Sequence, residues 1–345
     1  MTRSGPFSPA ADSAQKDLTA LGEFGLIERL FATLPQKAPG VTLGIGDDAA
    51  IVDIPPGQEL LTTTDTLVEG IHFRADCDPY LLGQKSLRVN LSDIAAMGGE
   101  PLWYLLSFSA GAQTKLHWVE AFARGLGDAG EAFGLTLIGG DTVGSRGGIS
   151  LTITLMGLVP KGQAVRRSGA QVGDLIYLSG TIGDAALGYA GKREWFDDEQ
   201  DWLYLQDRLN RPQPRVELGQ LLRERGLAHA MLDVSDGLVA DLGHLCKASN
   251  MGAEIHTEKL PLSPPVRALL TERGDEILQL ILTGGEDYEL LFTAPHSARK
   301  ELAKMATHAS ISLADVGRMV LDGSGLSLFQ SGTPLDVGKG GWRHF

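Results

Sequence analysis

The sequence predicts an α+β fold built from two domains. At 345 residues the chain is too long for one ordinary core, and a rule of about 150 residues per domain suggests two. Strand-like segments follow one another and helical segments come in groups, which favours α+β over a doubly wound sheet. We expect a disordered extension over residues 1–21, an N-terminal domain with a mixed or antiparallel sheet and helices over 22–160, and a C-terminal α/β domain over 161–345.

Composition and charge narrow the class of protein. Apolar residues make up 43% and charged residues 21% of the chain, as in a soluble globular protein. The formal net charge of −13 disfavours nucleic acid and anionic membranes as partners. No run of about 18 apolar residues occurs, so we expect no membrane span. Cys77 and Cys246 form no Cys-x-x-Cys pair, and we expect a reduced, cytoplasmic protein.

The first half of the chain alternates short strands with two long helices. A short helix is expected near 26–31, then strands at 49–54 and 59–64 around the turn Pro55-Pro56-Gly57. Asp78-Pro79 is a good helix start, because Asp caps the end and Pro occupies the first helical position. That helix ends at Gly98-Gly99. Further on we expect a strand at 102–108, a helix from 115, and strands at 135–138 and 149–156.

The helix that starts at Asp78 carries a polar stripe. Ser86, Asn90 and Asp93 fall at helical spacing along one face, while the other positions are mostly apolar. A polar stripe on an otherwise buried helix indicates a site.

The second half begins after a connecting segment at 160–173. We expect strands at 175–178 and 231–234, a surface helix or loop at 194–207, and a helix from the Ser235-Asp236-Gly237 turn to about 249. An apolar segment at 277–283 leads into the glycine-rich turn that begins at Gly284.

Clustered acids without local cations point to a metal site. Residues 38–73 contain six carboxylates and neither Lys nor Arg. Two carboxylates about 4 Å apart repel by roughly 4 kcal/mol at an effective dielectric constant of about 20, so a fold that gathers them needs protons or cations. Oxygen ligands without clustered His or Cys favour Mg²⁺ or Mn²⁺, which proteins bind together with substrate phosphates. The acids that follow strand-like segments in Gly-, Ser- or Thr-rich turns are Asp47, Asp48, Asp65, Asp141, Asp233 and Asp236.

The same residues allow other interpretations. Gly44-Ile-Gly-Asp-Asp-Ala49 fits the weak dinucleotide pattern, but two carboxylates would occupy the place of the pyrophosphate. The phosphate loop of NTPases and the protein-kinase motifs are absent from the sequence. Arg166 and Arg167 contact phosphate or lie in a solvated linker, and His72 is structural or part of a site. Trp342 is a packing residue or a stacking platform.

Taken together, the motifs resemble the thiamine-monophosphate kinase family. They are Gly-Ile-Gly-Asp-Asp-Ala from 44, Thr-Thr-Asp-Thr-Leu-Val-Glu-Gly-Ile-His-Phe from 63, Asn-Leu-Ser-Asp-Ile-Ala-Ala-Met-Gly from 90, Ile-Gly-Gly-Asp-Thr from 138, Asp-Val-Ser-Asp-Gly-Leu from 233 and Gly-Gly-Glu-Asp-Tyr-Glu-Leu from 284. Gly-Asp-Asp-Ala and Gly-Gly-Asp alone indicate only the wider superfamily of aminoimidazole-ribonucleotide synthetase. The chain lacks the N-terminal reactive Cys of selenophosphate synthetases and the C-terminal Cys of hydrogenase-maturation proteins.

The resemblance implies a reaction and a set of site residues. The reaction is ATP-dependent phosphorylation of thiamine monophosphate to thiamine diphosphate, with several Mg²⁺ ions and a homodimer. The implied metal ligands, of which Asp65 and Asp93 are expected to matter most, are Asp48, Thr63, Thr64, Asp65, Asp93, Asp141, Asp233 and Asp236. The implied ATP contacts are Ala123, Gly140, Asp141, Arg167 and Ser235, and the implied contacts to the thiamine moiety are His72, Glu286 and Trp342.

The chemistry expected of such a site needs no strong general base. The acceptor is itself a phosphate monoester, which is largely dianionic at pH 7 because its second pKa is about 6. We therefore expect direct in-line transfer without a phosphoenzyme. The rival hypotheses are another ATP-using member of the superfamily acting on an amidine or formyl substrate, and a non-catalytic nucleotide or metal sensor.

Overall fold

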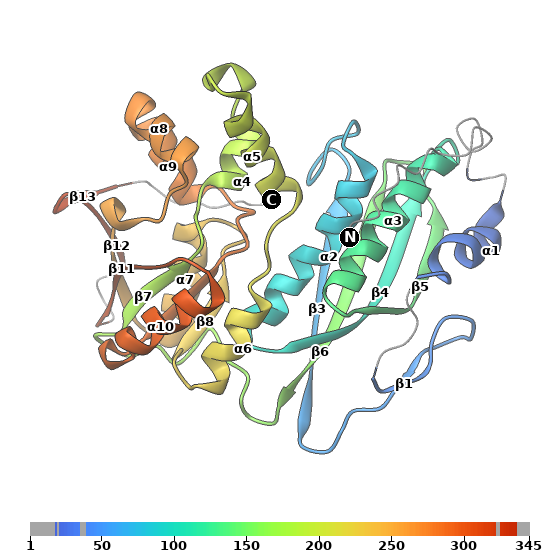
Figure 1. Ribbon diagram of the computed structural model, residues 1–345, viewed down its shortest axis with the longest axis horizontal. Coiled ribbons are helices and arrows are strands. Elements are labelled where there is room, and N and C mark those ends of the chain that lie inside the picture. Colours follow the sequence, from blue (N-terminus) through green and yellow to red (C-terminus); the bar gives the residue numbers. More distant parts are fainter. Residues whose placement is uncertain (1–17, 19–20, 35–38, 322–324, 337–345) are drawn as a thin grey trace. The chain divides into compact units, whose positions relative to one another are not determined.

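The computed structural model describes residue 18 and residues 21–34, 39–321 and 325–336. The chain divides into two compact units (Figure 1). Of the described residues, those up to 56, 62–90 and 101–157 belong to the first unit, and 57–61, 91–100 and those from 158 onward belong to the second. The extension expected over 1–21 lies outside the described residues except at 18 and 21, and Trp342 lies outside them as well.

The first unit is organised on a four-stranded sheet with the strand order β3-β6-β4-β5. The strands are β3 (Gln58–Val68), β4 (Glu100–Ala110), β5 (Thr136–Gly144) and β6 (Ser150–Pro160). Strands β4 and β5 are parallel, whereas β3 and β6 run antiparallel, because the hydroxyl of Thr64 meets that of Thr154 and the hydroxyl of Thr66 meets that of Thr152. The sheet is therefore mixed, as expected. The small strands β1 (Val41–Leu43) and β2 (Ile51–Val52) pair in a separate antiparallel ribbon.

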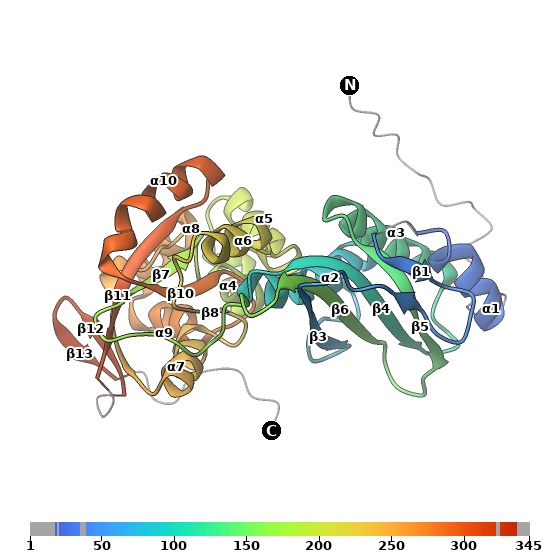
Figure 2. The same cartoon turned by 90° about the horizontal axis from the view of Figure 1, so that it is seen from below.

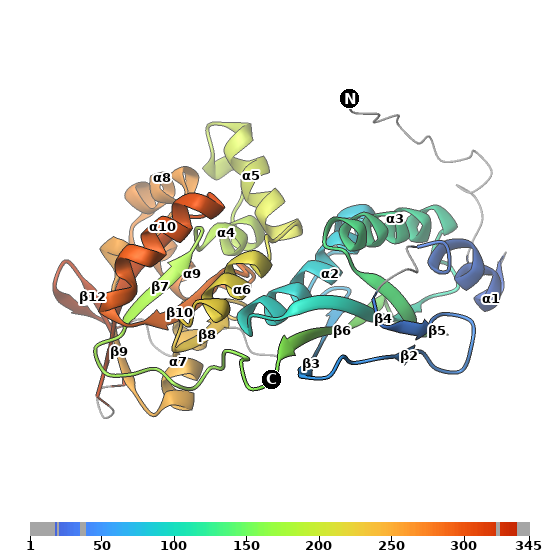
Figure 3. The ribbon, with the colours of Figure 1, turned by 60° about the horizontal axis from the view of Figure 1, so that its bottom comes forward.

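Helices cover one face of this sheet. Helix α3 (Leu116–Ala132) and the first part of α2 (Pro79–Ala96) lie on the same side of the strands (Figures 2 and 3). Phe108 of β4 meets Phe122 of α3 with ring centroids 5.9 Å apart, and Phe31 packs against the same Phe108 ring at 6.0 Å. Phe31 ends a π-helical turn (Ile27–Phe31) that continues α1 (Gly22–Leu26). Aromatic contacts of this kind anchor the helical layer to the sheet.

The second unit is organised on a seven-stranded sheet with the order β13-β12-β9-β11-β7-β10-β8. All of its pairs are antiparallel except β12 with β9. The strands are β7 (Leu175–Ser179), β8 (Ala230–Asp233), β9 (Gly252–His256), β10 (Leu290–Ala294), β11 (Leu313–Val320), β12 (Leu326–Gln330) and β13 (Thr333–Leu335).

Helices cover both faces of the seven-stranded sheet. Its central strands are therefore buried on both sides. Ile176 and Leu178 of β7 join one apolar cluster, and Tyr177 between them joins the other. The Ile176 cluster contains side chains from α4 (Asp184–Ala190), α5 (Glu199–Asn210), α7 (Leu238–Ser249), α8 (Pro264–Arg273) and α9 (Asp275–Thr283). The Tyr177 cluster contains side chains from α6 (Val216–Glu224), α10 (Arg299–Ala309) and the end of α2. Figure 2 shows α10 and α7 on opposite sides of the sheet.

The structure corrects one predicted strand and defines two further segments. The strand expected at 49–54 is reduced to Ile51–Val52, because the two prolines that follow give no backbone N–H to a ladder. The apolar segment at 277–283 is helical, as α9. The segment expected as surface helix or loop at 194–207 is mainly the helix α5. None of the described helices is both long enough and apolar enough to span a bilayer.

Candidate metal and nucleotide site

Strand β3 of the first unit carries three of the predicted ligands, and its pleat separates them. Burial alternates along the strand, so that Thr63 and Asp65 share the more buried side with Leu61 and Leu67. Thr64 faces the opposite side. Its hydroxyl donates to the carbonyl of Ile153 at 3.0 Å and lies 3.2 Å from the hydroxyl of Thr154 on β6. The ligand assignment of Thr64 stays a prediction.

The polar stripe of α2 reaches β3 through Asn90. Asn90 is fully buried, and its side-chain oxygen accepts the backbone N–H of Asp65 at 3.1 Å. Its amide nitrogen donates to the carbonyl of Ser86, and the Ser86 hydroxyl donates to the carbonyl of Gly83. Because β3 is the edge strand of its sheet, Asn90 supplies the partner that a neighbouring strand would otherwise provide. The stripe therefore fixes the backbone at Asp65.

The remaining predicted acidic ligands of the first unit, Asp48 and Asp141, are solvent-exposed. Asp48 lies in the turn after Gly46, and Asp141 lies within β5; both are exposed. Among the described residues, neither carboxylate forms a hydrogen bond or an ion pair with another side chain or backbone group. By contrast, Asp53 accepts a hydrogen bond from the Thr42 hydroxyl at 2.9 Å. Carboxylates without fixed protein donors are available for a ligand.

Two predicted ATP contacts differ in what they offer. Gly140 has φ = +155°, and a Cβ built there would lie 1.9 Å from the carbonyl oxygen of Leu106. Only glycine fits this close approach of β5 to β4. Ala123 is buried within α3, and its methyl group has no polar atom.

His72 follows β3 in a compact turn. Its Nδ1 accepts the backbone N–H of Val68 at 3.0 Å, and its own backbone N–H donates to the carbonyl of Val68 at 2.9 Å. The ring is half-buried. These two bonds fix the ring orientation and make Nδ1 an acceptor, so the neutral ring carries its proton on Nε2.

In the second unit, Asp233 is the most enclosed of the predicted ligands. It is 3% exposed at the end of β8, and its Oδ2 is a buried atom with no hydrogen-bond partner among the described residues. Burial and the nearby carboxylate of Asp93 raise the pKa of Asp233. The Ser92 hydroxyl partly offsets that rise, although its oxygen too is buried without a well-formed hydrogen bond. Buried polar atoms are almost always satisfied, so these groups fit a cation that satisfies them.

The turn after Asp233 is held by one carboxylate that the sequence analysis missed. Oδ2 of Asp241 accepts the backbone N–H groups of Ser235, Asp236 and Gly237 at 3.0, 3.0 and 3.1 Å. Burial raises the pKa of Asp241 to about 7, against the lowering effect of these N–H donors. The signal in the sequence is an acid in the first turn of α7, where it caps the preceding turn. Ser235 and Asp236 are thereby held in place.

The Gly284–Tyr288 turn packs against the same segment. Glu286 N–H donates to the carbonyl of Ser235, and Tyr288 N–H donates to the carbonyl of Val234, each at 2.8 Å. A Cβ at Gly285 would lie 2.1 Å from the Ser235 carbonyl oxygen, so glycine is required for this approach. Of the remaining predicted ATP contacts, Arg167 is exposed, and its carbonyl accepts a hydrogen bond from the hydroxyl of Ser249 at 3.2 Å.

A network of buried charges, also missed from the sequence, lies behind this turn. Glu289 is fully buried and accepts hydrogen bonds from Arg208 at 2.8 Å, from Arg215 at 2.6 and 2.7 Å, and from the Ser179 hydroxyl at 2.6 Å. Asp184 lies 3.4 Å from the Nε of Arg208. Two arginines around one buried carboxylate satisfy the charge that burial would otherwise make costly.

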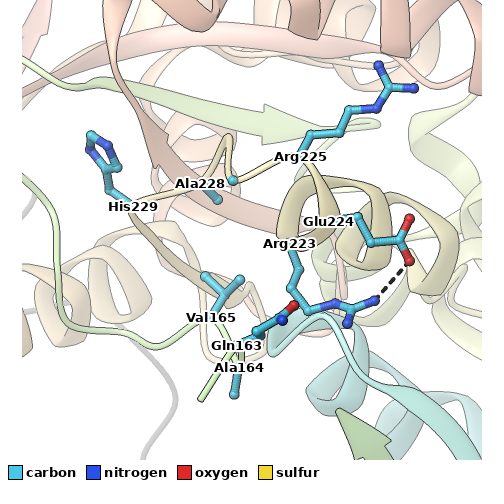
Figure 4. Close-up of a pocket in the computed structure, with 9 residues that line it drawn as sticks. Gln163, Ala164, Val165, Arg223, Glu224, Arg225, Ala228 and His229 are labelled. Atoms are coloured by element: carbon cyan, nitrogen blue, oxygen red, sulfur yellow. Dashed lines mark hydrogen bonds and ion pairs between the residues drawn. The ribbon is translucent and has the colours of Figure 1, made fainter. Parts of the chain in front are cut away.

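One cavity of about 490 Å³ in the second unit contains none of these groups. It is lined by residues 163–165, 223–226, 228 and 229 (Figure 4). Its basic side chains are already paired, Arg223 with Glu224, Arg225 with Glu301 and His229 with Asp174. We assign it no role in the site.

The comparisons with known proteins decide the family. The AIR synthase related N-terminal domain matches residues 46–159, and the corresponding C-terminal domain matches residues 171–327. Thiamine-monophosphate kinase of Escherichia coli strain K12 is 43% identical over 328 residues, which cover 94% of this chain and 99% of that protein. The chain belongs to the thiamine-monophosphate kinase family.

Solved structures of the family share the fold. Thiamine-monophosphate kinase from Stenotrophomonas maltophilia K279a is 42% identical with a TM-score of 0.79, over 91% of this chain and 98% of that one. AaThiL complexed with AMPPCP and TMP is 35% identical with a TM-score of 0.73, over 96% of this chain and 99% of that one. Membership in the thiamine-monophosphate kinase family makes the chain an ATP-dependent phosphotransferase, and the two-domain fold predicted from the motifs is confirmed.

The predicted ligand residues are of the chemical type that binds Mg²⁺ together with substrate phosphates. Within the described part of the chain, no group of three or more His, Cys, Asp or Glu side chains is arranged to hold a metal ion. Mg²⁺ is usually bound by one or two carboxylates together with substrate phosphates and water. Asp233 with its unsatisfied Oδ2, next to Asp93, and the uncommitted carboxylates of Asp48 and Asp141 are donors of that kind.

Proposed function

We propose that this chain transfers the γ-phosphoryl group of ATP to thiamine monophosphate, yielding thiamine diphosphate and ADP. The observation that carries the proposal is the likeness, at 35% identity over 96% of this chain, to AaThiL complexed with AMPPCP and TMP. It is supported by the match of the acidic motifs at Asp48, Asp65, Asp141, Asp233 and Asp236 to the family motifs.

We propose that the reaction is a direct in-line transfer. A phosphate oxygen of thiamine monophosphate attacks the γ-phosphorus, and the bond from that phosphorus to the bridging oxygen of ADP breaks. The attacking phosphate is largely dianionic at pH 7, since its second pKa is about 6, and it needs no general base. Bound Mg²⁺ would neutralise charge on the transferring group. The proposed ligands of the metal are Asp48, Thr63, Thr64, Asp65, Asp93, Asp141, Asp233 and Asp236.

The hydrogen bonds that fix the site segments suggest roles for individual residues. Asn90 fixes the backbone at Asp65, and Asp241 fixes the turn that carries Ser235 and Asp236. We propose that Gly140, Arg167 and Ser235 contact ATP, because glycine allows close approach of phosphate and Arg and Ser supply donors. Ala123 remains a weak member of this set, since its side chain has no polar atom.

We propose that His72, Glu286 and Trp342 contact the thiamine moiety. A cationic thiazolium suits a carboxylate and an aromatic face. Trp342 lies outside the described residues, so its part rests on the family resemblance alone. A homodimer formed through the N-terminal domains also belongs to this proposal; size-exclusion chromatography with light scattering tests it by distinguishing one chain from two.

Turnover of the purified chain tests the function. With ATP, Mg²⁺ and thiamine monophosphate we expect thiamine diphosphate and ADP in equal amounts, separated by chromatography. Parallel incubations with aminoimidazole precursors test the rival superfamily activity, and incubation without any acceptor tests for a sensor that only binds nucleotide. For the in-line mechanism, γ-phosphorothioate of defined chirality should be transferred with inversion; retention, or a labelled Asp or His, would reject it.

A further inference from the structure

We propose that Asp287 is a positioning residue, whose buried carboxylate fixes the Gly284–Tyr288 turn against the start of α4 and thereby sets how Glu286 meets the substrate. The inference rests on the proposed function, because it takes Glu286 as a contact to the thiamine moiety. We assign Asp287 itself no chemical step.

The carboxylate of Asp287 is held by two donors distant in the sequence. Oδ2 accepts the backbone N–H of Gly183 at 2.7 Å, and Oδ1 accepts that of Ala185 at 3.1 Å. The donors lie 104 and 102 positions away along the chain, and Asp287 is 2% exposed. Both donors are backbone groups, which cannot reverse into acceptors. An acceptor at both oxygens is therefore needed, which a carboxylate provides and an amide does not.

The backbone on either side of Asp287 adopts a conformation that needs such support. Glu286 has φ = +71° and Tyr288 has φ = +53°. Left-handed backbone is disfavoured for residues with a Cβ, and it persists only where the surroundings determine it. Here the N–H groups of Glu286 and Tyr288 are bound by the carbonyls of Ser235 and Val234, and the residue between them is anchored on the other side by α4.

Close packing removes the alternatives for the turn. A Cβ at Gly284 would lie 2.4 Å from the Cβ of Ala186 in α4, and a Cβ at Gly285 would lie 2.1 Å from the carbonyl oxygen of Ser235. The turn is thus enclosed between α4 and the 234–236 segment. If the anchor at Asp287 is lost, the left-handed backbone angles at Glu286 and Tyr288 can relax, which would redirect the Glu286 side chain.

Asp184 provides a matched control in the same region. It is fully buried like Asp287, but its donors are the hydroxyls of Thr181 and Ser263 at 2.5 Å and of Tyr204 at 3.1 Å, in addition to Arg208. Hydroxyl groups can rotate to accept as well as donate, so an amide at position 184 finds partners. None of these hydrogen bonds joins the side chain of Asp184 to the Gly284–Tyr288 turn.

The test compares Asp287→Asn and Asp184→Asn in the full-length enzyme. We expect Asp287→Asn to raise the KM for thiamine monophosphate about 10- to 100-fold, the order expected when a binding group is misplaced by about 1 Å, while the KM for ATP stays within about twofold. Asp184→Asn should leave both KM values within about twofold. Amide hydrogen exchange should rise at Gly183, Ala185 and Glu286 in Asp287→Asn and not in Asp184→Asn.

A second variant, Asp287→Ser, guards against a folding defect. Its hydroxyl can accept one N–H and, unlike the amide of Asn, places no fixed N–H donor against the other, so it should show a smaller rise in the same KM. The assignment would be overturned if Asp287→Asn changed the KM values for both substrates equally, matching the effects of Asp184→Asn. It would also be overturned if both Asp287 variants failed to fold. If the wild-type chain shows no turnover with thiamine monophosphate, the proposed function fails. The exchange data would then still decide whether Asp287 fixes the turn.

Discussion

Two acid-bearing, glycine-rich turns of this chain look alike in the sequence and differ in the structure. In the first unit, Asp48 follows Gly46, is exposed, and has no fixed hydrogen-bond donor among the described residues. In the second unit, Asp287 follows Gly285, is 2% exposed, and has both oxygens bound by backbone N–H groups. The comparison teaches that similar turns can hold either a carboxylate bound by the protein's own donors or one that is left available to a ligand.

The second unit contains both kinds of acid within a few residues. Oδ2 of Asp233 is buried without a partner among the described residues, whereas Oδ2 of Asp241 accepts three backbone N–H groups. Burial alone therefore does not separate ligand from scaffold. The two carboxylates differ in the hydrogen-bond partners of their oxygens.

The largest effect is expected on the free energy of unfolding, when the buried charge network around Glu289 is disrupted. Glu289→Gln removes the charge that Arg208 and Arg215 share, and loss of one partner from a buried ion pair costs about 3–5 kcal/mol. Urea unfolding followed by circular dichroism measures the loss. The control is Asp76→Asn, which removes the ion pair between Arg74 and Asp76. Their side chains are 81% and 71% exposed, so the unfolding transition should stay unchanged. Equal transitions for the two variants would contradict the distinction.

The next effect concerns an acid assigned to the metal. Asp65→Asn should lower kcat about 100- to 1000-fold, the order of removing one charge-stabilising group from a transition state, with the fold unchanged. Steady-state assays at saturating ATP and thiamine monophosphate measure it, with circular dichroism as the check on folding. Turnover close to that of the wild type would remove Asp65 from the ligand set.

The two units can also be compared through the pH dependence of the alkylation of their cysteines. Burial and the carboxylates of Asp78, Asp76 and Glu69 raise the pKa of Cys77 to about 11, and burial raises the pKa of Cys246 to about 11. A raised thiol pKa leaves less thiolate at pH 8, by about 100-fold for a shift of about two units. We expect slow alkylation of native Cys77 by iodoacetamide at pH 8 and a rate that climbs steadily toward pH 10.

Cys246 serves as the comparison, because it is 6% exposed in the second unit while Cys77 is half-buried in the first. Its alkylation should stay slower than that of Cys77 at every pH and should become fast only in urea. Mass spectrometry of tryptic peptides reports both sites. Rapid labelling of Cys77 at pH 8 would show that its surroundings are more open than the structure has them.

The smallest expected effect is on the stability of the second unit, when a methyl group is added at a glycine that has open space around it. Gly243 in α7 has open space at its Cβ position, so Gly243→Ala should stabilise the chain by about 0.5–1 kcal/mol. Gly285→Ala places a Cβ 2.1 Å from the Ser235 carbonyl oxygen and should destabilise it by about 1–3 kcal/mol. Thermal melting measures both, and shifts of the same sign would contradict the packing described for the turn.

Much of the fold and part of the site follow from local patterns. Asp78-Pro79 predicts the start of α2, and the polar stripe at Ser86 and Asn90 is buried and hydrogen-bonded within the first unit. That the stripe belongs to a site stays a prediction. The anchors of the turns could not be predicted, because Asp287 meets donors 102 and 104 positions away and no local pattern encodes that pairing. The strand expected at 49–54 was wrong in extent, since only Ile51 and Val52 pair with β1.

The most direct test of the central claim is divalent metal binding by two neighbouring acids of the first unit. Asp48 and Asp53 are both exposed, but only Asp53 has a fixed donor among the described residues, the Thr42 hydroxyl. With AMPPCP present, Mn²⁺ titration followed by electron paramagnetic resonance should show binding weakened about 10-fold or more in Asp48→Asn and unchanged in Asp53→Asn. Equal Mn²⁺ affinity in the two variants would contradict the claim that uncommitted carboxylates are the metal ligands.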